Sequence, residues 1–93
     1  MINVNEYFNG QVKSLGYETS AGKSTIGVIS PGEYEFSTSQ EEIMTVIEGE
    51  LIAFLPLNQS WETFGKGQHF VVPAHTAFKV KATAQTAYLC QYR

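Results

Sequence analysis

The chain has 93 residues, of which 43% are hydrophobic, and its nine acidic and six basic residues give a net charge of −3. That length predicts one domain, residues 1–93, with a small core of the kind that a subunit interface often extends, so we expect a homodimer. The basic residues are scattered, which leaves no stripe for nucleic acid, and no segment approaches the roughly 20 apolar residues that a membrane span needs.

The N-terminal segment and the cysteine content predict where the protein works. Residues 1–10 have neither a basic start nor an apolar run, so we do not expect a secretory signal. The single cysteine, Cys90, has no partner for an internal disulfide. We therefore expect a reducing, cytoplasmic location.

Turn residues divide the chain at close spacing, which is typical of an all-β sandwich or barrel. No segment between them is long enough to predict a helix. The turn signals are Gly10, Gly16, Ala21 with Gly22, Pro31 with Gly32, Gly49, and the segments 56–60, 65–67 and 82–85.

The first informative strands lie in the middle of the chain. Successive side chains of a strand point to opposite faces, so Tyr34, Phe36 and Thr38 share one face of segment 32–38. In segment 41–49 both alternating rows are largely apolar. We expect that strand to be covered on both sides.

Glu42 is the unusual residue of that strand, because it alternates with Met44 and Val46, which we expect to be interior. An interior carboxylate needs hydrogen-bonding partners or a raised pKa. The alternative is that the strand only begins here, which would leave Glu42 at a solvated rim.

Two C-terminal segments, 77–83 and 86–93, alternate in the same way. Lys79 and Lys81 point outward in the first. Cys90 is expected to be a small buried side chain rather than a nucleophile, because no base is evident beside it. The residues expected to point inward are Phe78, Val80, Tyr88, Cys90 and Tyr92.

Two blocks of the chain resemble those of the cupin superfamily, which are small jelly-roll-like β-barrels. Glu42 is followed by six residues and Gly49, and Gly67 is followed by five residues and Pro73. The resemblance implies an all-β, single-domain cupin fold.

The residues at the metal-ligand positions of cupins differ from what a metal site needs. Metal-binding cupins carry histidines at positions that correspond here to Phe36, Thr38 and Phe78. Of four expected ligands only Glu42 is present, and one carboxylate does not hold a transition metal. We expect no bound metal. The alternative is a rearranged ligand set formed by His69, His75 and Glu42.

A closer resemblance covers nearly the whole chain. The order and spacing of six segments resemble the bacterial pyrimidine/purine nucleoside phosphorylase family, which are cupins of about this length. The resemblance implies phosphate-dependent cleavage of purine and pyrimidine ribonucleosides to a free base and ribose 1-phosphate, with phosphate as co-substrate and no cofactor. The segments are 5–8, 12–14, 32–38, 41–46, 72–75 followed by Phe78, and 88–92.

The chemistry of that reaction selects candidate site residues. A carboxylate holds sugar hydroxyls and favours positive charge on the ribose, so we predict Glu42 as a catalytic residue. His75, in the turn after Pro73, is the second predicted catalytic residue. Cationic side chains suit phosphate, which selects Lys13 and Arg93. A flat apolar wall suits the base. The predicted substrate-binding residues are Tyr34, Phe36, Thr38, Phe78, Tyr88 and Tyr92.

Other interpretations of the same residues remain open. Phe36 and Phe78 are equally suited to plain core packing, and Tyr88 and Tyr92 to the core or a dimer interface. A metal-dependent isomerase or dioxygenase with an unusual ligand set is one alternative function. A non-catalytic module that binds a small ligand is another.

Overall fold

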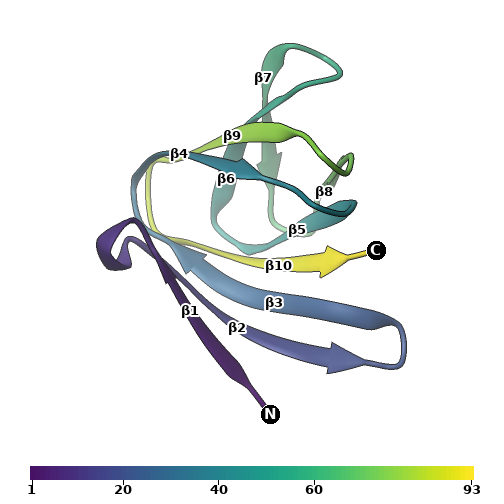
Figure 1. Cartoon of the computed structure of the whole chain (residues 1–93). Coiled ribbons are helices and arrows are strands. Elements are labelled where there is room, and N and C mark those ends of the chain that lie inside the picture. Colours follow the sequence, from purple (N-terminus) through teal and green to yellow (C-terminus); the bar gives the residue numbers. More distant parts are fainter.

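The computed structural model describes residues 1–93 and contains ten β-strands and one short 3₁₀ helix (Figure 1). This confirms the all-β prediction, and no helix has the length and hydropathy needed to cross a membrane. The elements are β1 (Asn3–Tyr7), η1 (Phe8–Gly10), β2 (Val12–Thr19), β3 (Gly22–Ile29), β4 (Gly32–Ser37), β5 (Glu42–Glu48), β6 (Glu50–Leu55), β7 (Ser60–Gly65), β8 (His69–Val72), β9 (Ala77–Ala82) and β10 (Thr86–Tyr92).

The strands form two antiparallel sheets. The six-stranded sheet has the order β1-β2-β3-β10-β5-β8, and the four-stranded sheet has the order β4-β9-β6-β7. Figure 1 shows the last strand, β10, lying beside β3 in the six-stranded sheet. This pairing brings the N-terminal strands next to the C-terminal one, so residues distant in sequence can line one cavity.

The inner faces of the two sheets pack together around a core of 15 buried apolar residues. Val12 and Ile29 come from the six-stranded sheet, and Leu51 and Val80 from the four-stranded sheet. Their alternation with outward polar residues is what a two-layer β fold requires. The inward residues predicted for the two C-terminal segments are buried or half-buried, which confirms that pattern.

Strand β5 is not covered on both sides, so that prediction was wrong. Met44 and Val46 face the core, but Ile43 and Thr45 are half-buried and Ile47 is exposed. The second row belongs to the outer face of the six-stranded sheet, over which the chain places no other layer.

Thr38 fastens the end of β4 to the turn between β8 and β9. Its hydroxyl donates to the Pro73 carbonyl oxygen at 2.7 Å and accepts from the Thr76 backbone N–H at 3.1 Å. A buried hydroxyl with both functions satisfied contributes to rigidity. The adjacent turn residue, His75, is exposed and has a positive φ of 57°.

Candidate active site

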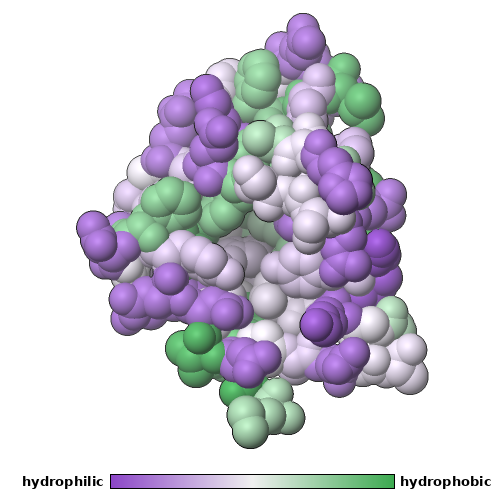
Figure 2. Space-filling model, in the orientation of Figure 1, coloured by the Kyte–Doolittle hydropathy of each residue, from purple (hydrophilic) through white to green (hydrophobic).

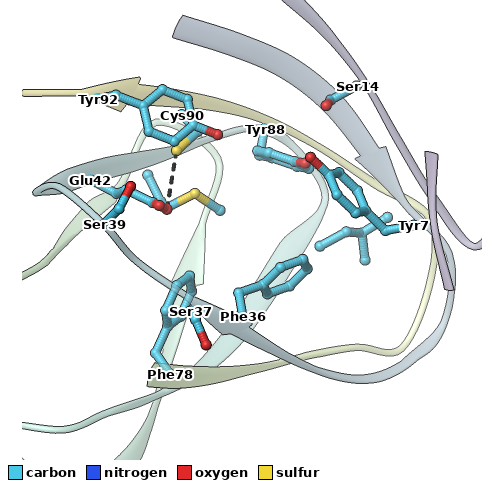
Figure 3. Close-up of a pocket in the computed structure, with 12 residues that line it drawn as sticks. Tyr7, Ser14, Phe36, Ser37, Ser39, Glu42, Phe78, Tyr88, Cys90 and Tyr92 are labelled. Carbon is cyan, nitrogen blue, oxygen red and sulfur yellow. Dashed lines mark hydrogen bonds between the residues drawn. The ribbon is translucent and has the colours of Figure 1, made fainter. Parts of the chain in front are cut away.

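A cavity of about 400 Å³ lies between the two sheets, which is within the size range of small-molecule sites. Figure 2 shows the surface hollowed near the middle of one face of the molecule. Aromatic and hydroxyl side chains dominate its wall, and Glu42 supplies the charge (Figure 3). The lining residues are Tyr7, Ser14, Ile29, Phe36, Ser37, Ser39, Glu42, Met44, Phe78, Tyr88, Cys90 and Tyr92.

One end of the cavity is aromatic. Phe36 of β4 and Phe78 of β9 are paired across the four-stranded sheet, with ring centroids 5.7 Å apart. Tyr7, at the end of β1, approaches from the other sheet. These side chains form a flat apolar wall of the kind that receives an aromatic ring.

A strained corner follows Tyr7. Phe8, Asn9 and Gly10 all have positive φ values, of 54°, 56° and 85°. A bulky residue in this region is uncommon and persists only when its surroundings hold it there. The Phe8 ring packs against Tyr34 at 5.0 Å and against Phe36 at 5.6 Å, and these contacts hold the corner that places Tyr7 at the cavity.

The opposite end of the cavity carries the ionisable groups. Glu42 is paired with Tyr92 across β5 and β10, and the Cys90 thiol donates to Glu42 Oε1 at 3.4 Å (Figure 3). Burial raises the pKa of Glu42, and the thiol donor offsets part of that rise. Glu42 is therefore a half-buried carboxylate whose protonation is sensitive to its surroundings.

Burial also raises the pKa of the Cys90 thiol and of the Tyr92 hydroxyl, so both remain protonated at neutral pH. No base beside Cys90 was evident from the sequence, but the structure places the Glu42 carboxylate there. Because the thiol keeps its proton, its role at this site is to donate a hydrogen bond rather than to attack a substrate.

Tyr88 lies across the middle of the inner face of the six-stranded sheet. Burial raises its pKa to about 12, and a hydrogen bond with Ser14 acts in the opposite direction. Gly27 pairs with Tyr88 on one side and with Ser14 on the other. The Tyr88 ring occupies the space where any side chain at position 27 would begin.

Comparison with known proteins shows which family the chain belongs to. The family model described as pyrimidine/purine nucleoside phosphorylase matches residues 2–92. The pyrimidine/purine nucleoside phosphorylase of Marinobacter nauticus is 55% identical over 92 residues, which is 99% of each chain. The chain belongs to this family. The resemblance recognised in the six sequence segments is thereby confirmed.

Solved structures with the same fold include two that cover nearly the whole chain. A Vibrio parahaemolyticus protein of unknown function has a TM-score of 0.95 at 39% identity, covering 100% of this chain and 99% of that one. The polyketide cyclase RemF from Streptomyces resistomycificus has a TM-score of 0.72 at 16% identity, covering 96% of this chain and 71% of that one. The second likeness concerns the fold alone, and it agrees with the all-β prediction.

The structure of this nucleoside phosphorylase family member brings only part of the predicted site together. The predicted residues that line the cavity are Phe36, Glu42, Phe78, Tyr88 and Tyr92. Burial and alternation sufficed to find them because all five lie on inner faces of strands.

Three predicted residues on inner or turn positions lie outside the cavity. The Tyr34 hydroxyl donates to the Ser30 carbonyl oxygen at 2.8 Å, and the Thr38 hydroxyl is occupied by Pro73 and Thr76. His75 is exposed in its turn, where its positive φ takes it out of the strand alternation.

The two cations predicted to bind phosphate also lie outside the cavity. Lys13 pairs with Glu6 at 3.8 Å, and both side chains are largely exposed. Arg93 donates through Nη1 to the carbonyl oxygens of Lys23 at 3.0 Å and Tyr92 at 2.7 Å. The Lys13 ammonium group and the Arg93 guanidinium group therefore do not line the main cavity.

Seven lining residues were not predicted as site residues: the apolar or thiol side chains of Ile29, Met44 and Cys90, and the hydroxyl-bearing Tyr7, Ser14, Ser37 and Ser39. Ser14 left a signal, because it alternates with the buried residues Val12 and Gly16 and is thus a polar side chain in an inward row. Ser37 alternates with the inward residue Phe36 and would therefore point outward in a regular strand. It is the last residue of β4, where alternation no longer predicts the side to which a residue points. Tyr7 left no such signal.

The rearranged metal site is not assembled. No group of three or more His, Cys, Asp or Glu side chains lies close enough to hold a metal ion. His69 is on the exposed outer face of β8 and His75 is in an exposed turn, whereas Glu42 faces the interior. These three residues do not converge.

Proposed function

We propose that this chain, as one domain spanning residues 1–93, catalyses phosphorolysis of purine and pyrimidine ribonucleosides. The observation that carries the proposal is a cavity with an aromatic wall at one end and a half-buried carboxylate at the other. Full-length similarity to phosphorylases of that name gives it independent support. Phosphate is the co-substrate, and the proposed reaction uses no cofactor.

The base packs against Phe36 and Phe78. Stacking on an aromatic wall stabilises any nucleobase, because every base has a π face, and it is insensitive to the groups on the base edge. No charged side chain lies at this end of the cavity to read those edges. Acceptance of both purines and pyrimidines follows from this kind of wall.

Glu42 acts on the ribose. Its carboxylate accepts hydrogen bonds from sugar hydroxyls, and its negative charge stabilises the positive charge that develops on the ring as the bond from C1′ to the base nitrogen breaks. The electron pair of that bond leaves with the base, and a phosphate oxygen forms the new bond to C1′. The proton of hydrogen phosphate balances the one that the departing base takes up.

The Cys90 thiol serves as the positioning group for Glu42, and Tyr92 is the cross-strand neighbour of that carboxylate. The thiol contacts the carboxylate directly, and Tyr92 lies beside it in register. Tyr88 closes the wall between the aromatic end and this cluster. A fixed carboxylate is worth more to a transition state than a mobile one, because no reorganisation is needed during the reaction.

The decisive test is base release by the purified protein. Uridine and inosine should give uracil and hypoxanthine only when phosphate is supplied, with an equal amount of ribose 1-phosphate, as measured by liquid chromatography. A chelator should leave the rate unchanged. No release from any nucleoside contradicts the proposal. A nucleoside that raises the melting temperature without turnover indicates a binding module, and chelator-sensitive release indicates a metal enzyme.

We also propose a homodimer formed through the outer face of the six-stranded sheet. Val4, Leu15 and Ile26 are 75%, 48% and 45% exposed and lie side by side in register across β1, β2 and β3. The band continues through Leu89 of β10. A contiguous apolar band of this kind marks an interaction surface, and a second copy is self-complementary to it.

Ile26→Lys is expected to convert the protein to a monomer, because the charge falls in the middle of the apolar band. Light scattering after size exclusion should report twice the chain mass of 10.3 kDa for the wild type and that mass once for the variant. Thr63→Lys, on the exposed surface of β7, is the matched control. A monomeric wild type rules the dimer out.

We place the protein in the cytoplasm, since its one cysteine is a free, buried thiol.

A further inference from the structure

A second depression, of about 320 Å³, lies beside the main cavity and is polar where the main cavity is aromatic. Ser39 and Tyr92 line both. The two spaces are therefore neighbours that share a wall. Besides these two, the depression is lined by Met1, Asn3, Asn5, Gly16, Tyr17, Glu18, Lys23, Ser24, Thr25 and Gln40.

The shared wall is made of small polar side chains. The Tyr92 hydroxyl lies 3.5 Å from Thr25 Oγ1, with Tyr92 lining both spaces and Thr25 the depression. Asn5 Nδ2 donates to Ser14 Oγ at 3.3 Å, which joins a residue of the depression to one of the main cavity. Hydroxyl and amide groups on this wall can serve a polar ligand from either side.

The depression has an unpaired positive charge, and the main cavity has none. Lys23 lines the depression, and the Arg93 guanidinium is fastened to the Lys23 and Tyr92 carbonyl oxygens beside it. The only ion pair in the structure joins Lys13 to Glu6. Glu18 also lines the depression and lies opposite Lys23 in the register of β2 and β3, but neither Lys23 nor Arg93 forms an ion pair with a carboxylate. An anion inside the main cavity would instead face Glu42.

The position of the depression suits the direction of attack. In a displacement at C1′, the incoming oxygen and the departing base lie on opposite sides of the ribose. Figure 3 shows Ser39, Tyr92 and Glu42 together at the end of the cavity away from Phe36. With the base against the aromatic wall and the ribose at Glu42, the depression behind Tyr92 and Ser39 faces the side of the ribose remote from the base.

We infer that this polar depression is the phosphate subsite, with Lys23 as its principal cation and the hydroxyl groups of Ser39, Thr25 and Tyr92 as further donors. The inference rests on the proposed phosphorylase activity and says where that activity takes its second substrate. Cationic and hydroxyl donors around a phosphate are the usual chemistry of such sites.

Steady-state kinetics of Lys23→Gln test the inference. We expect the KM for inorganic phosphate to rise about tenfold, which is the loss of one charge-assisted contact, while the KM for uridine stays unchanged. Lys23→Arg should restore most of the phosphate affinity. Lys66→Gln, an exposed lysine in the turn before β8, should have no effect. A calorimetric scan should also show that phosphate raises the melting temperature of the wild type more than that of Lys23→Gln.

The outcomes separate the inference from the function on which it rests. A wild type without phosphorolysis overturns the function. An active wild type whose phosphate KM is unchanged in Lys23→Gln overturns the subsite alone, as does an equal rise in both KM values. Uridine 5′-monophosphate tests the other source of the same chemistry. If Lys23→Gln weakens inhibition by this nucleotide and leaves the phosphate KM unchanged, the depression serves a nucleotide and the inference is wrong.

Discussion

Glu42→Gln is expected to lower kcat for phosphorolysis roughly 100-fold, which is the usual scale for losing one preorganised electrostatic contact at a developing charge. The amide keeps the shape of the carboxylate and still accepts one hydrogen bond from a ribose hydroxyl. What it removes is the negative charge facing the ribose. The loss should therefore appear in kcat more than in the KM for the nucleoside.

The same substitution is expected to raise the melting temperature at neutral pH. Because burial raises the pKa of Glu42 in the folded protein, the folded chain holds this proton to a higher pH than the unfolded chain does. The free energy of unfolding of the wild type therefore falls as the pH rises from about 4.5 through the raised pKa. Glutamine carries no charge and is free of that penalty, so the variant trades activity for stability.

Calorimetry at neutral pH and near pH 4.5, together with kcat, checks both effects. The stability gain of Glu42→Gln over the wild type should shrink toward the acidic end, where the wild-type carboxyl group is protonated. Wild-type activity should fall over the same acidic range. Glu41→Gln alters the exposed neighbour and should change neither quantity. Full activity in Glu42→Gln, or a lower melting temperature, contradicts the assignment.

Strand alternation was enough to place Glu42 because the period of two is a local property of any strand. It assigned Phe78, Tyr88 and Tyr92 to inner faces without knowledge of which strands pair. It placed Ser14 in an inward row, but it could not show that Ser14 and Tyr7 line the cavity. Their nearness to β10 depends on the pairing of β3 with β10, a contact between distant segments that no local pattern specifies.

His75 and β5 show two other limits of the sequence. A turn residue has no alternation to fix its direction, and the positive φ of His75 points it away from the cavity. The two apolar rows of β5 predicted a covering layer on both faces, and the chain supplies one on the inner face alone. An apolar outer row does not distinguish a strand covered by its own chain from one covered by a second copy, as in the proposed dimer, because both arrangements would bury the same side chains.

Gly27→Ala is the second substitution expected to have a large effect. A Cβ atom at position 27 would lie 2.6 Å from both Cζ and the hydroxyl oxygen of Tyr88. The backbone of Gly27 is in an ordinary extended strand, so the conflict is one of space alone. Overpacking of this kind costs about 1–3 kcal/mol, and each kcal/mol lowers the melting temperature of a domain this size by roughly 4–8 °C.

The Tyr88 ring can relieve the conflict only by leaving the sheet surface, and the open space on its other side is the cavity. The KM for nucleosides should therefore rise along with the loss of stability. Gly16→Ala is the matched control, since a Cβ atom there meets its nearest neighbour at an ordinary 3.6 Å. That variant should resemble the wild type in both measurements.

The double variant Gly27→Ala with Tyr88→Leu separates crowding from other causes. Leucine removes the ring that the new methyl group meets. The stability losses of the two single variants should therefore sum to more than the loss of the double variant. Nucleoside binding should remain weak, because the double variant also lacks the Tyr88 wall. If Gly27→Ala has the melting temperature and nucleoside KM of the wild type, the tyrosine does not need that glycine, and a small side chain at position 27 leaves the cavity intact.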